Sequence, residues 1–215
     1  MSEIASSDDR LKLILVSDGV GDVARVEAIV QDAVRGGLRC VQLREPTWSA
    51  RDMLRVCERL KPLLDDVGGL LLVNDRLDVV SCGAAHGAQV GHRSLPLHLA
   101  RAVIGPHMLL GYSAHGAKEL AEAAEHGCNF ALLAPVWATT CKPEAVCLGV
   151  RQAGDLTAQA RLPVVWLGGV GPNTMAQMAE LPVPKRPIGV AVRSAIMESD
   201  DPCSTVRTLL AHWPS

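Results

Sequence analysis

The stretch "LPVVWLGGVGPNT", residues 162–174, contains the pattern on which the fold prediction depends. Its first half is a continuous apolar run, which is typical of a strand buried on both faces of a parallel sheet. The run ends at Gly168 and Gly169 and leads into a helical pattern. A buried strand followed directly by a helix is the repeating unit of α/β folds.

Seven further apolar runs occupy residues 11–18, 38–45, 69–75, 86–92, 107–115, 129–136 and 187–196. Amphipathic helical patterns over residues 22–35, 49–64 and 116–127 separate some of them, and the first two open on the candidate N-caps Asp22 and Ser49. Two links are weaker as helices, because residues 76–83 form a short segment and residues 146–160 include two glycines.

Eight strand–helix units in a chain of this length average about 27 residues each, which predicts a small (β/α)8 TIM barrel. We therefore expect a polar N-terminal tail over residues 1–10 and a single barrel domain over residues 11–215. A doubly wound open sheet is the alternative, because periodicity cannot distinguish a closed sheet from an open one.

Composition excludes several classes of protein. A formal charge of −2 argues against a nucleic-acid or membrane-surface binder. The N-terminal residues do not resemble a secretory signal and no run is long enough to cross a bilayer, so we expect a cytoplasmic protein. The seven cysteines and seven histidines show no metal-ligand spacing, which favours reduced, mostly buried thiols.

Polar residues stand at the ends of nearly all the predicted strands, which is where barrel enzymes build their sites. They are Ser17, Asp18, Gln42, Arg44, Glu45, Asn74, Asp75, Arg76, Gln89, Ser113 and His115, followed by the loop over residues 139–142. Single positions also have structural interpretations: Arg44 with Glu45 as a rim salt bridge, and Asn74-Asp75 as a turn or helix cap.

The last two units predict a phosphate site. Gly168 and Gly169 allow close approach of the backbone, and Ser194 lies near the start of a helix in "VAVRSAI". The loops after the seventh and eighth strands of barrels often bind phosphate. Arg193 either adds a phosphate contact or points outward.

Six ordered stretches, "VQLRE", "LLVNDRLDVV", "GYSAH", "APVWATTCKP", "WLGGVGPNT" and "GVAVRSAI", resemble those of the family of thiamine phosphate synthase and the TenI-type thiazole tautomerase. The resemblance spans residues 11–205 and implies a (β/α)8 barrel. The synthase branch implies joining of a thiazole phosphate to a pyrimidine diphosphate, with Mg²⁺ on the diphosphate.

The chain is similar to the synthase pattern at Gln42, Arg44, Asn74 and Asp75, and the resemblance assigns the first magnesium carboxylate to Asp75. It departs where Pro46 replaces a lysine, Gln89 a histidine and Ser94 the second aspartate. In the later loop, Thr139 and Lys142 match while Cys141 replaces a threonine. Losing one carboxylate and one ammonium weakens a magnesium–diphosphate clamp.

At those departures the chain resembles the tautomerase branch, through Gln89, through Ser113 with His115, and through Cys141-Lys142. That branch implies aromatisation of a carboxythiazole phosphate without a cofactor. His115 matches the histidine that moves the proton, a suitable task for a group with a pKa near neutrality. Under this hypothesis Arg44 and Lys142 hold the carboxylate, while Gln42 and Gln89 orient the ring.

We therefore expect an isomerase, a thiazole tautomerase. One alternative is a divergent magnesium-dependent synthase, a transferase. The other is a regulatory barrel that binds thiazole or pyrimidine phosphates without catalysis. The expected ligand is a phosphorylated thiazole, with a pyrimidine diphosphate in the synthase case, and a homo-oligomer is left open. Lys142 is the expected ligand group of its loop, while Cys141 serves mainly to mark the branch.

Overall fold

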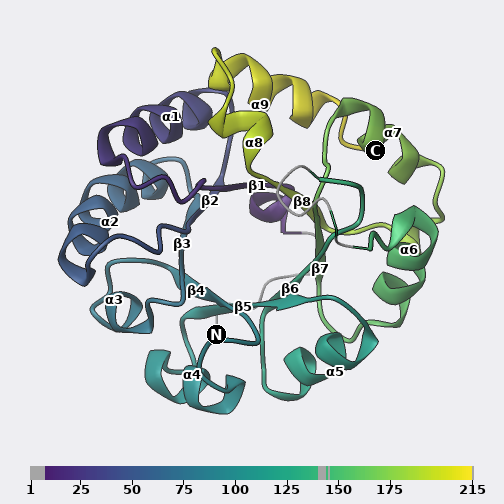
Figure 1. Cartoon of the computed structure of the whole chain (residues 1–215), viewed down its shortest axis with the longest axis horizontal. Helices are drawn as coiled ribbons and strands as arrows, with labels where there is room; N and C mark the ends of the chain where they lie inside the picture. The colour runs from purple at the N-terminus through teal and green to yellow at the C-terminus, as the bar shows by residue number, and fades with distance from the viewer. Residues whose placement is uncertain (1–7, 140–143, 145, 215) are drawn as a thin grey trace.

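The computed structural model describes residues 8–139, 144 and 146–214. Eight parallel strands close into a barrel in chain order, with β1 paired to β8 through Ile14 and Ala191 (Figure 1). The strands are β1 Leu13–Val16, β2 Cys40–Leu43, β3 Leu70–Asn74, β4 Gly87–Val90, β5 Leu109–Ala114, β6 Phe130–Leu133, β7 Val164–Leu167 and β8 Gly189–Val192. The closed barrel confirms the predicted fold over the open sheet.

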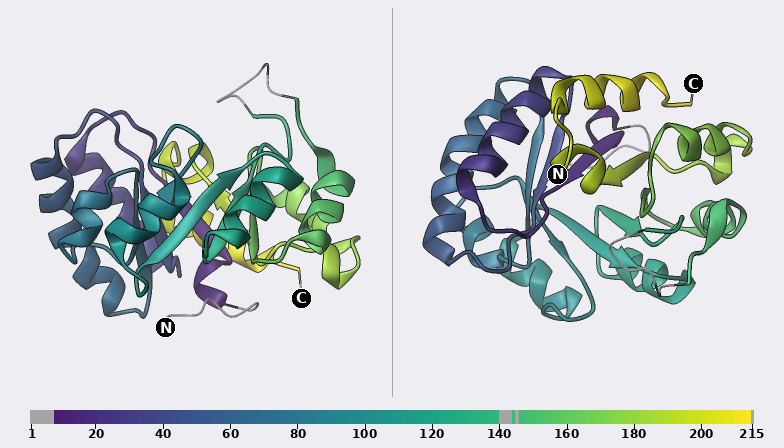
Figure 2. Two further views of the ribbon diagram at one scale, coloured as in Figure 1. Left: turned by 90° about the horizontal axis from the view of Figure 1, so that it is seen from below. Right: turned by 45° about the horizontal axis from the view of Figure 1, so that its top comes forward.

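Helices surround the barrel on its outer side (Figures 1 and 2). They are α1 Val23–Arg35, α2 Ala50–Asp65, α3 Leu77–Ser81, α4 Leu97–Ile104, α5 Ala117–Glu125, α6 Gly149–Gln159, α7 Pro172–Ala179, α8 Ser194–Met197 and α9 Pro202–Ala211. Two short 3-10 helices, η1 Asp9–Leu11 and η2 Val183–Lys185, complete the described elements. In the part of the chain that the structure describes, no helix is both long and apolar enough to cross a bilayer.

Helix starts follow the local sequence. The side chain of Asp22 accepts a hydrogen bond from the backbone of Arg25, and Ser49 caps α2 in the same way through Asp52, as predicted. The weak segment over residues 146–160 does contain a helix, α6. Its Gly154 has a packing reason, because a Cβ there would lie 3.2 Å from side-chain atoms of Leu181.

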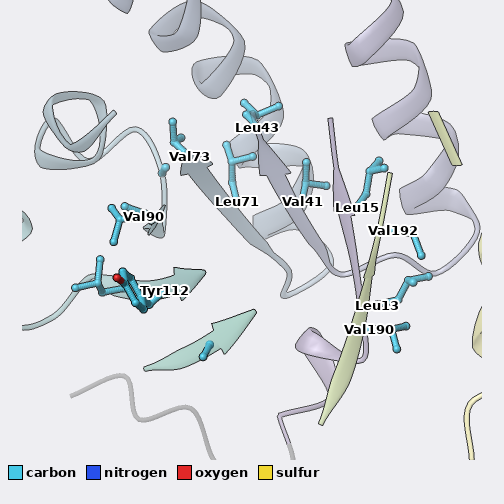
Figure 3. Close-up of a cluster of buried hydrophobic side chains, with 14 of the residues drawn as sticks. Leu13, Leu15, Val41, Leu43, Leu71, Val73, Val90, Tyr112, Val190 and Val192 are labelled. Atoms are coloured by element: carbon cyan, nitrogen blue, oxygen red, sulfur yellow. The ribbon is translucent and has the colours of Figure 1, made fainter. Parts of the chain in front are cut away.

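The strands are apolar along their whole length because both of their faces are buried. Side chains such as Leu15, Val41 and Leu71 point toward the helices (Figure 3). Inside the barrel, Phe130 packs with Ile14 and other aliphatic side chains. This arrangement explains why the runs lack the alternation of a half-exposed sheet.

The N-terminal end of the barrel is covered by η1, drawn in purple within the ring of strands in Figure 1. Leu11 is fully buried there, and its carbonyl lies so close to Gly189 that a Cβ on this glycine would sit 1.7 Å away. Asp8 caps η1 and forms an ion pair with Arg10. The folded domain therefore begins before residue 11, inside the predicted tail.

Candidate active site

A cavity of about 580 Å³ opens at the C-terminal ends of the strands. Ten of the twelve residues predicted for the site line it: Gln42, Arg44, Asn74, Asp75, Ser113, His115, Gly168, Gly169, Arg193 and Ser194. Of the other two, Gln89 is buried beneath the cavity and Lys142 lies outside the described residues, as does Cys141. Strand ends far apart in sequence therefore meet in one site.

The floor of the cavity has a polar half and an apolar half. Gln42, Asn74 and Ser113 supply amides and a hydroxyl from β2, β3 and β5, whereas Leu132 and Leu167 supply apolar surface from β6 and β7. A flat heteroaromatic ring fits such a floor, because its faces and carbon edge are apolar while its ring nitrogens need hydrogen-bond partners.

A chain of hydrogen bonds orients the carboxylate of Asp75. The Gln42 amide donates to Oδ1 of Asn74 at 3.0 Å, and the Asn74 amide donates to Oδ2 of Asp75 at 2.7 Å. The hydroxyl of Ser94 donates to Oδ1 of Asp75 and accepts from the backbone N–H of Gly91 at 2.7 Å. The carboxylate of Asp75 is thus held by Asn74 at the end of β3 and by Ser94 in the segment after β4.

Asp75 is the one non-glycine residue with positive φ, at 61°, within the described ranges. Aspartate tolerates this left-handed region better than most residues, yet the conformation still costs free energy. The side chain does not cap α3, whose N-cap residue is Arg76. The helix-cap interpretation of Asn74-Asp75 is therefore wrong for Asp75.

Gln89 is fully buried and donates from Nε2 to the hydroxyl of Ser113 at 3.0 Å. Its Oε1 occupies the space that a Cβ on Gly111 would need, only 2.1 Å away. Gln89 does not line the cavity and positions Ser113 from below. The sequence predicted a direct contact between Gln89 and the substrate ring, and this geometry does not support it.

His115 lies exposed at the mouth, with its ring Nδ1 2.5 Å from the carbonyl oxygen of Ala134. A carbonyl can only accept, so Nδ1 carries the proton and Nε2 is left as a base in the neutral ring. The backbone N–H of His115 donates to Glu119, which fixes the start of α5. The imidazole is therefore held in one tautomer beside the cavity.

Gly168 and Gly169 have φ values of 102° and 66°, and the segment after β6 packs directly against them. A Cβ on Gly169 would lie 2.4 Å from the carbonyl oxygen of Ala138 and 2.7 Å from Trp137. Both glycines also line the cavity, where a phosphate could reach their backbone. Phosphate binding at this place stays a prediction. Their lack of side chains is already required by packing.

Arg44 and Glu45 do not form the rim salt bridge that was one interpretation of this pair. Glu45 is buried and accepts hydrogen bonds from the backbone N–H groups of Gly19 at 3.1 Å and Gly21 at 2.9 Å. Arg44 lines the cavity instead, and its backbone N–H donates to Ser17 at 2.8 Å. Glu45 is structural, and Arg44 is available to a ligand.

Sequence reasoning missed His92 and Arg93, which line the cavity next to Ser94. They follow β4 just as Arg44 follows β2, so the strand-end rule could have found them. Asp18, in contrast, pairs with Arg25 and does not line the cavity.

The described residues contain no group of three or more His, Cys, Asp or Glu side chains arranged to hold a metal. Asp75 is the single carboxylate among the described residues that line the cavity. Mg²⁺ bound to phosphates often needs only one or two protein carboxylates, so Asp75 meets this requirement at its minimum.

Cysteines in the described residues form no disulfide, and Cys40, Cys57 and Cys128 are buried. Burial raises the pKa of the Cys57 and Cys128 thiols to about 12, and that of Cys40 in the same direction. These three thiols stay protonated near neutral pH. Cys82 is exposed and Cys147 and Cys203 are partly exposed, so the prediction of mostly buried thiols is confirmed for only half of the six described cysteines.

Comparison with known proteins gives one consistent result. The profile of a family described as thiamine monophosphate synthase matches residues 13–196. The thiamine-phosphate synthase of Laribacter hongkongensis is 35% identical over 95% of each chain. A putative thiamine-phosphate synthase of Geobacter sulfurreducens is also 35% identical, over 87% of this chain and 86% of its own.

Among solved structures, thiamine phosphate pyrophosphorylase from Pyrococcus furiosus has a TM-score of 0.82 at 25% identity, over 95% of this chain and 96% of its own. A 3-hexulose-6-phosphate synthase has a TM-score of 0.75 at 16% identity, over 94% of this chain and 100% of its own, and shares the fold alone.

Proposed function

Because the chain belongs to the thiamine monophosphate synthase family, we propose that it joins a thiazole phosphate to a pyrimidine diphosphate. This proposal reverses the order of preference that the sequence motifs suggested, in which the tautomerase came first. The names of the relatives favour the transferase. Membership of a family of biosynthetic enzymes also disfavours a barrel that only binds its ligands.

The observation that carries the proposal is the distribution of charged groups around the cavity. Arg44 and Asp75 follow the neighbouring strands β2 and β3, whereas Gly168 and Arg193 follow β7 and β8. Arg44 and Arg193 stand on either side of β1, and the backbone of Gly168 follows next to Arg193 in the ring of strands. These groups support the binding of substrates that carry phosphate.

In the proposed reaction a ring nitrogen of the thiazole forms a bond to the methylene carbon of the pyrimidine, and the carbon–oxygen bond to diphosphate breaks. Arg44 neutralises negative charge that builds up on the leaving diphosphate. The amides of Gln42 and Asn74 hydrogen-bond to ring nitrogens and hold the two rings in register. Asp75 is the residue that would hold Mg²⁺, which supplies further neutralisation of the diphosphate when bound.

The test is an assay with both phosphorylated precursors, run with Mg²⁺ and with a chelator. In the presence of Mg²⁺ we expect thiamine phosphate and pyrophosphate to form in equal amounts. Aromatisation of a carboxythiazole phosphate, with no thiamine phosphate from the two precursors, would contradict the proposal.

A second candidate is the thiazole tautomerase, and the geometry of His115 favours it. In the neutral tautomer that the Ala134 carbonyl favours, Nε2 of His115 is suited to take a proton from a ring carbon and return it to another position. The synthase pattern has a second magnesium aspartate where this chain has Ser94. The tautomerase reaction needs no metal ligand at that position, so this replacement also favours it. Rising ultraviolet absorbance of a carboxythiazole phosphate, independent of chelator, is the result expected of this activity.

A further inference from the structure

The segment after β4 carries a positive charge into the cavity. Arg44, Arg93 and Arg193 line it together with His92 and His115, whereas Asp75 is the single carboxylate among its described lining residues. Both oxygens of Asp75 already accept hydrogen bonds, from Asn74 and from Ser94. The described lining of the cavity thus has more cationic than anionic groups.

We propose that Arg93 binds the terminal phosphate of the diphosphate substrate directly, so that diphosphate binding does not require Mg²⁺. This inference rests on the proposed synthase function and names the group that holds its leaving diphosphate.

Topology places Arg93 beside the two groups already assigned to the diphosphate. Arg44, Asp75 and Arg93 follow the consecutive strands β2, β3 and β4 and line one side of the cavity. The hydrogen bond from Ser94 to Asp75 ties the segment after β4 to the end of β3. Arg93, one residue before Ser94, is therefore anchored close to Asp75.

The guanidinium of Arg93 is available for a ligand. Its side chain is exposed at the cavity, and none of the ion pairs formed by the described residues includes Arg93 or Arg44. A guanidinium presents a planar set of donors that matches two oxygens of one phosphate. Two such groups on either side of Asp75 can neutralise a diphosphate without a metal.

Isothermal calorimetry of inorganic pyrophosphate with the full chain, in the presence of chelator, tests the proposal. We expect measurable binding that Arg93→Ala weakens about tenfold or more, as loss of a charge-assisted hydrogen-bonded pair should. The matched control is Arg207→Ala, which removes an exposed arginine of α9 outside the cavity and should leave binding unchanged. Equal binding by Arg93→Ala and the unaltered chain would overturn the proposal.

A second pair of variants tests the charge of the same segment. Ser94→Asp places a carboxylate next to Asp75, so we expect weaker pyrophosphate binding in chelator and recovery of binding in Mg²⁺. Ser94→Ala removes the same hydrogen bond without adding charge and should show no such dependence on Mg²⁺. If the two variants behave alike, charge on this segment does not control binding and the proposal fails.

The two proposals fail in different ways. If pyrophosphate binding depends on Arg93 but no thiamine phosphate is made, the synthase assignment is wrong while the anion site stands. If thiamine phosphate is made and Arg93→Ala binds pyrophosphate normally, only the role of Arg93 is wrong. A thermal unfolding curve for each variant confirms that it is folded.

Discussion

The hydroxyl of Ser94 donates a hydrogen bond to Oδ1 of Asp75 and joins the segment after β4 to the end of β3. The amide of Asn74 holds the other oxygen, Oδ2, at 2.7 Å. Protein groups therefore hold both oxygens of the carboxylate, in a backbone conformation that few residues accept.

Replacing Asp75 by Asn removes the negative charge and keeps the size of the side chain. Asparagine accepts a left-handed backbone, so the fold should be retained. We expect thiamine phosphate formation at low Mg²⁺ to fall by at least about tenfold, because the one carboxylate among the described residues that line the cavity is lost. Steady-state rates measured across a range of Mg²⁺ concentrations check this, and unchanged rates would show that Asp75 has no part in metal use.

His115 can be tested with a variant that keeps its structural hydrogen bond. In His115→Asn the side-chain amide can still donate to the carbonyl of Ala134, but no base remains in the place of Nε2. Tautomerase turnover, if present, should fall about 10²–10⁴-fold. Thiamine phosphate formation should change much less, so assaying both reactions in the same preparation tells whether His115 transfers a proton.

Glu45→Ala should lower the free energy of unfolding by about 2–4 kcal/mol, because the N–H groups of Gly19 and Gly21 lose a buried charged acceptor. Glu45→Gln retains one acceptor oxygen, but its NH2 group faces the other backbone N–H and cannot accept from it, so we expect a smaller loss than in Glu45→Ala. Urea denaturation followed by circular dichroism measures both variants. A loss in Glu45→Gln as large as in Glu45→Ala would mean that both carboxylate oxygens are needed as acceptors.

Gly169→Ala should destabilise the chain more than Gly127→Ala does. Both glycines have positive φ, at 66° and 69°, but a Cβ on Gly127 would meet nothing within 4 Å, whereas one on Gly169 would lie 2.4 Å from the carbonyl oxygen of Ala138. Strain of about 1 kcal/mol is expected at Gly127 from φ alone, with at least about 1–2 kcal/mol more at Gly169. Equal losses in chemical denaturation would show that the segment after β6 moves aside freely.

His86 should make stability depend on pH. Its Nδ1 accepts the backbone N–H of Leu71 at 2.8 Å, and burial lowers its pKa despite the opposing effect of Asp65, 2.7 Å from Nε2. The folded pKa lies below the unfolded one, so the unfolded chain binds more protons in between. The stabilising contribution is therefore complete above a pH of about 6.5 and is lost as the pH falls through the folded pKa.

The matched variant for this prediction is His86→Gln, which does not titrate. The difference in unfolding free energy between the unaltered chain and His86→Gln, about 1 kcal/mol at neutral pH, should shrink as the pH is lowered toward 5. A difference that stays constant over this range would mean that His86 does not lose its hydrogen bond on protonation. Asp65 titrates below this window, because the hydrogen bond from Lys61 lowers its pKa.

Much of the fold could be predicted from local patterns. The N-caps Asp22 and Ser49 act on backbone groups only three residues ahead, so their effect is visible in a short stretch of sequence. The short helix α3 and the glycine-containing helix α6 were predicted less clearly. Both are stabilised by packing against other elements, which a local pattern does not contain.

The candidate site was predictable wherever it depended on strand ends. Parallel strands of a closed barrel all end at the same mouth, so Arg44, Asp75 and Ser113 meet there whatever their separation in sequence. The same rule missed Arg93 and assigned Gln89 to the substrate, because it says nothing about how deep a side chain lies.

Sequence alone determined the eight-unit barrel, the family and the set of side chains at the strand ends, because these depend on periodicity and on short motifs. Tertiary structure decided which of those side chains face the cavity and which hold the protein together. Glu45 finds its partners 24 and 26 residues away, and Ser94 reaches Asp75 across 19 residues. Such contacts are set by strand register and barrel closure, which bring distant residues together in ways that no local pattern specifies.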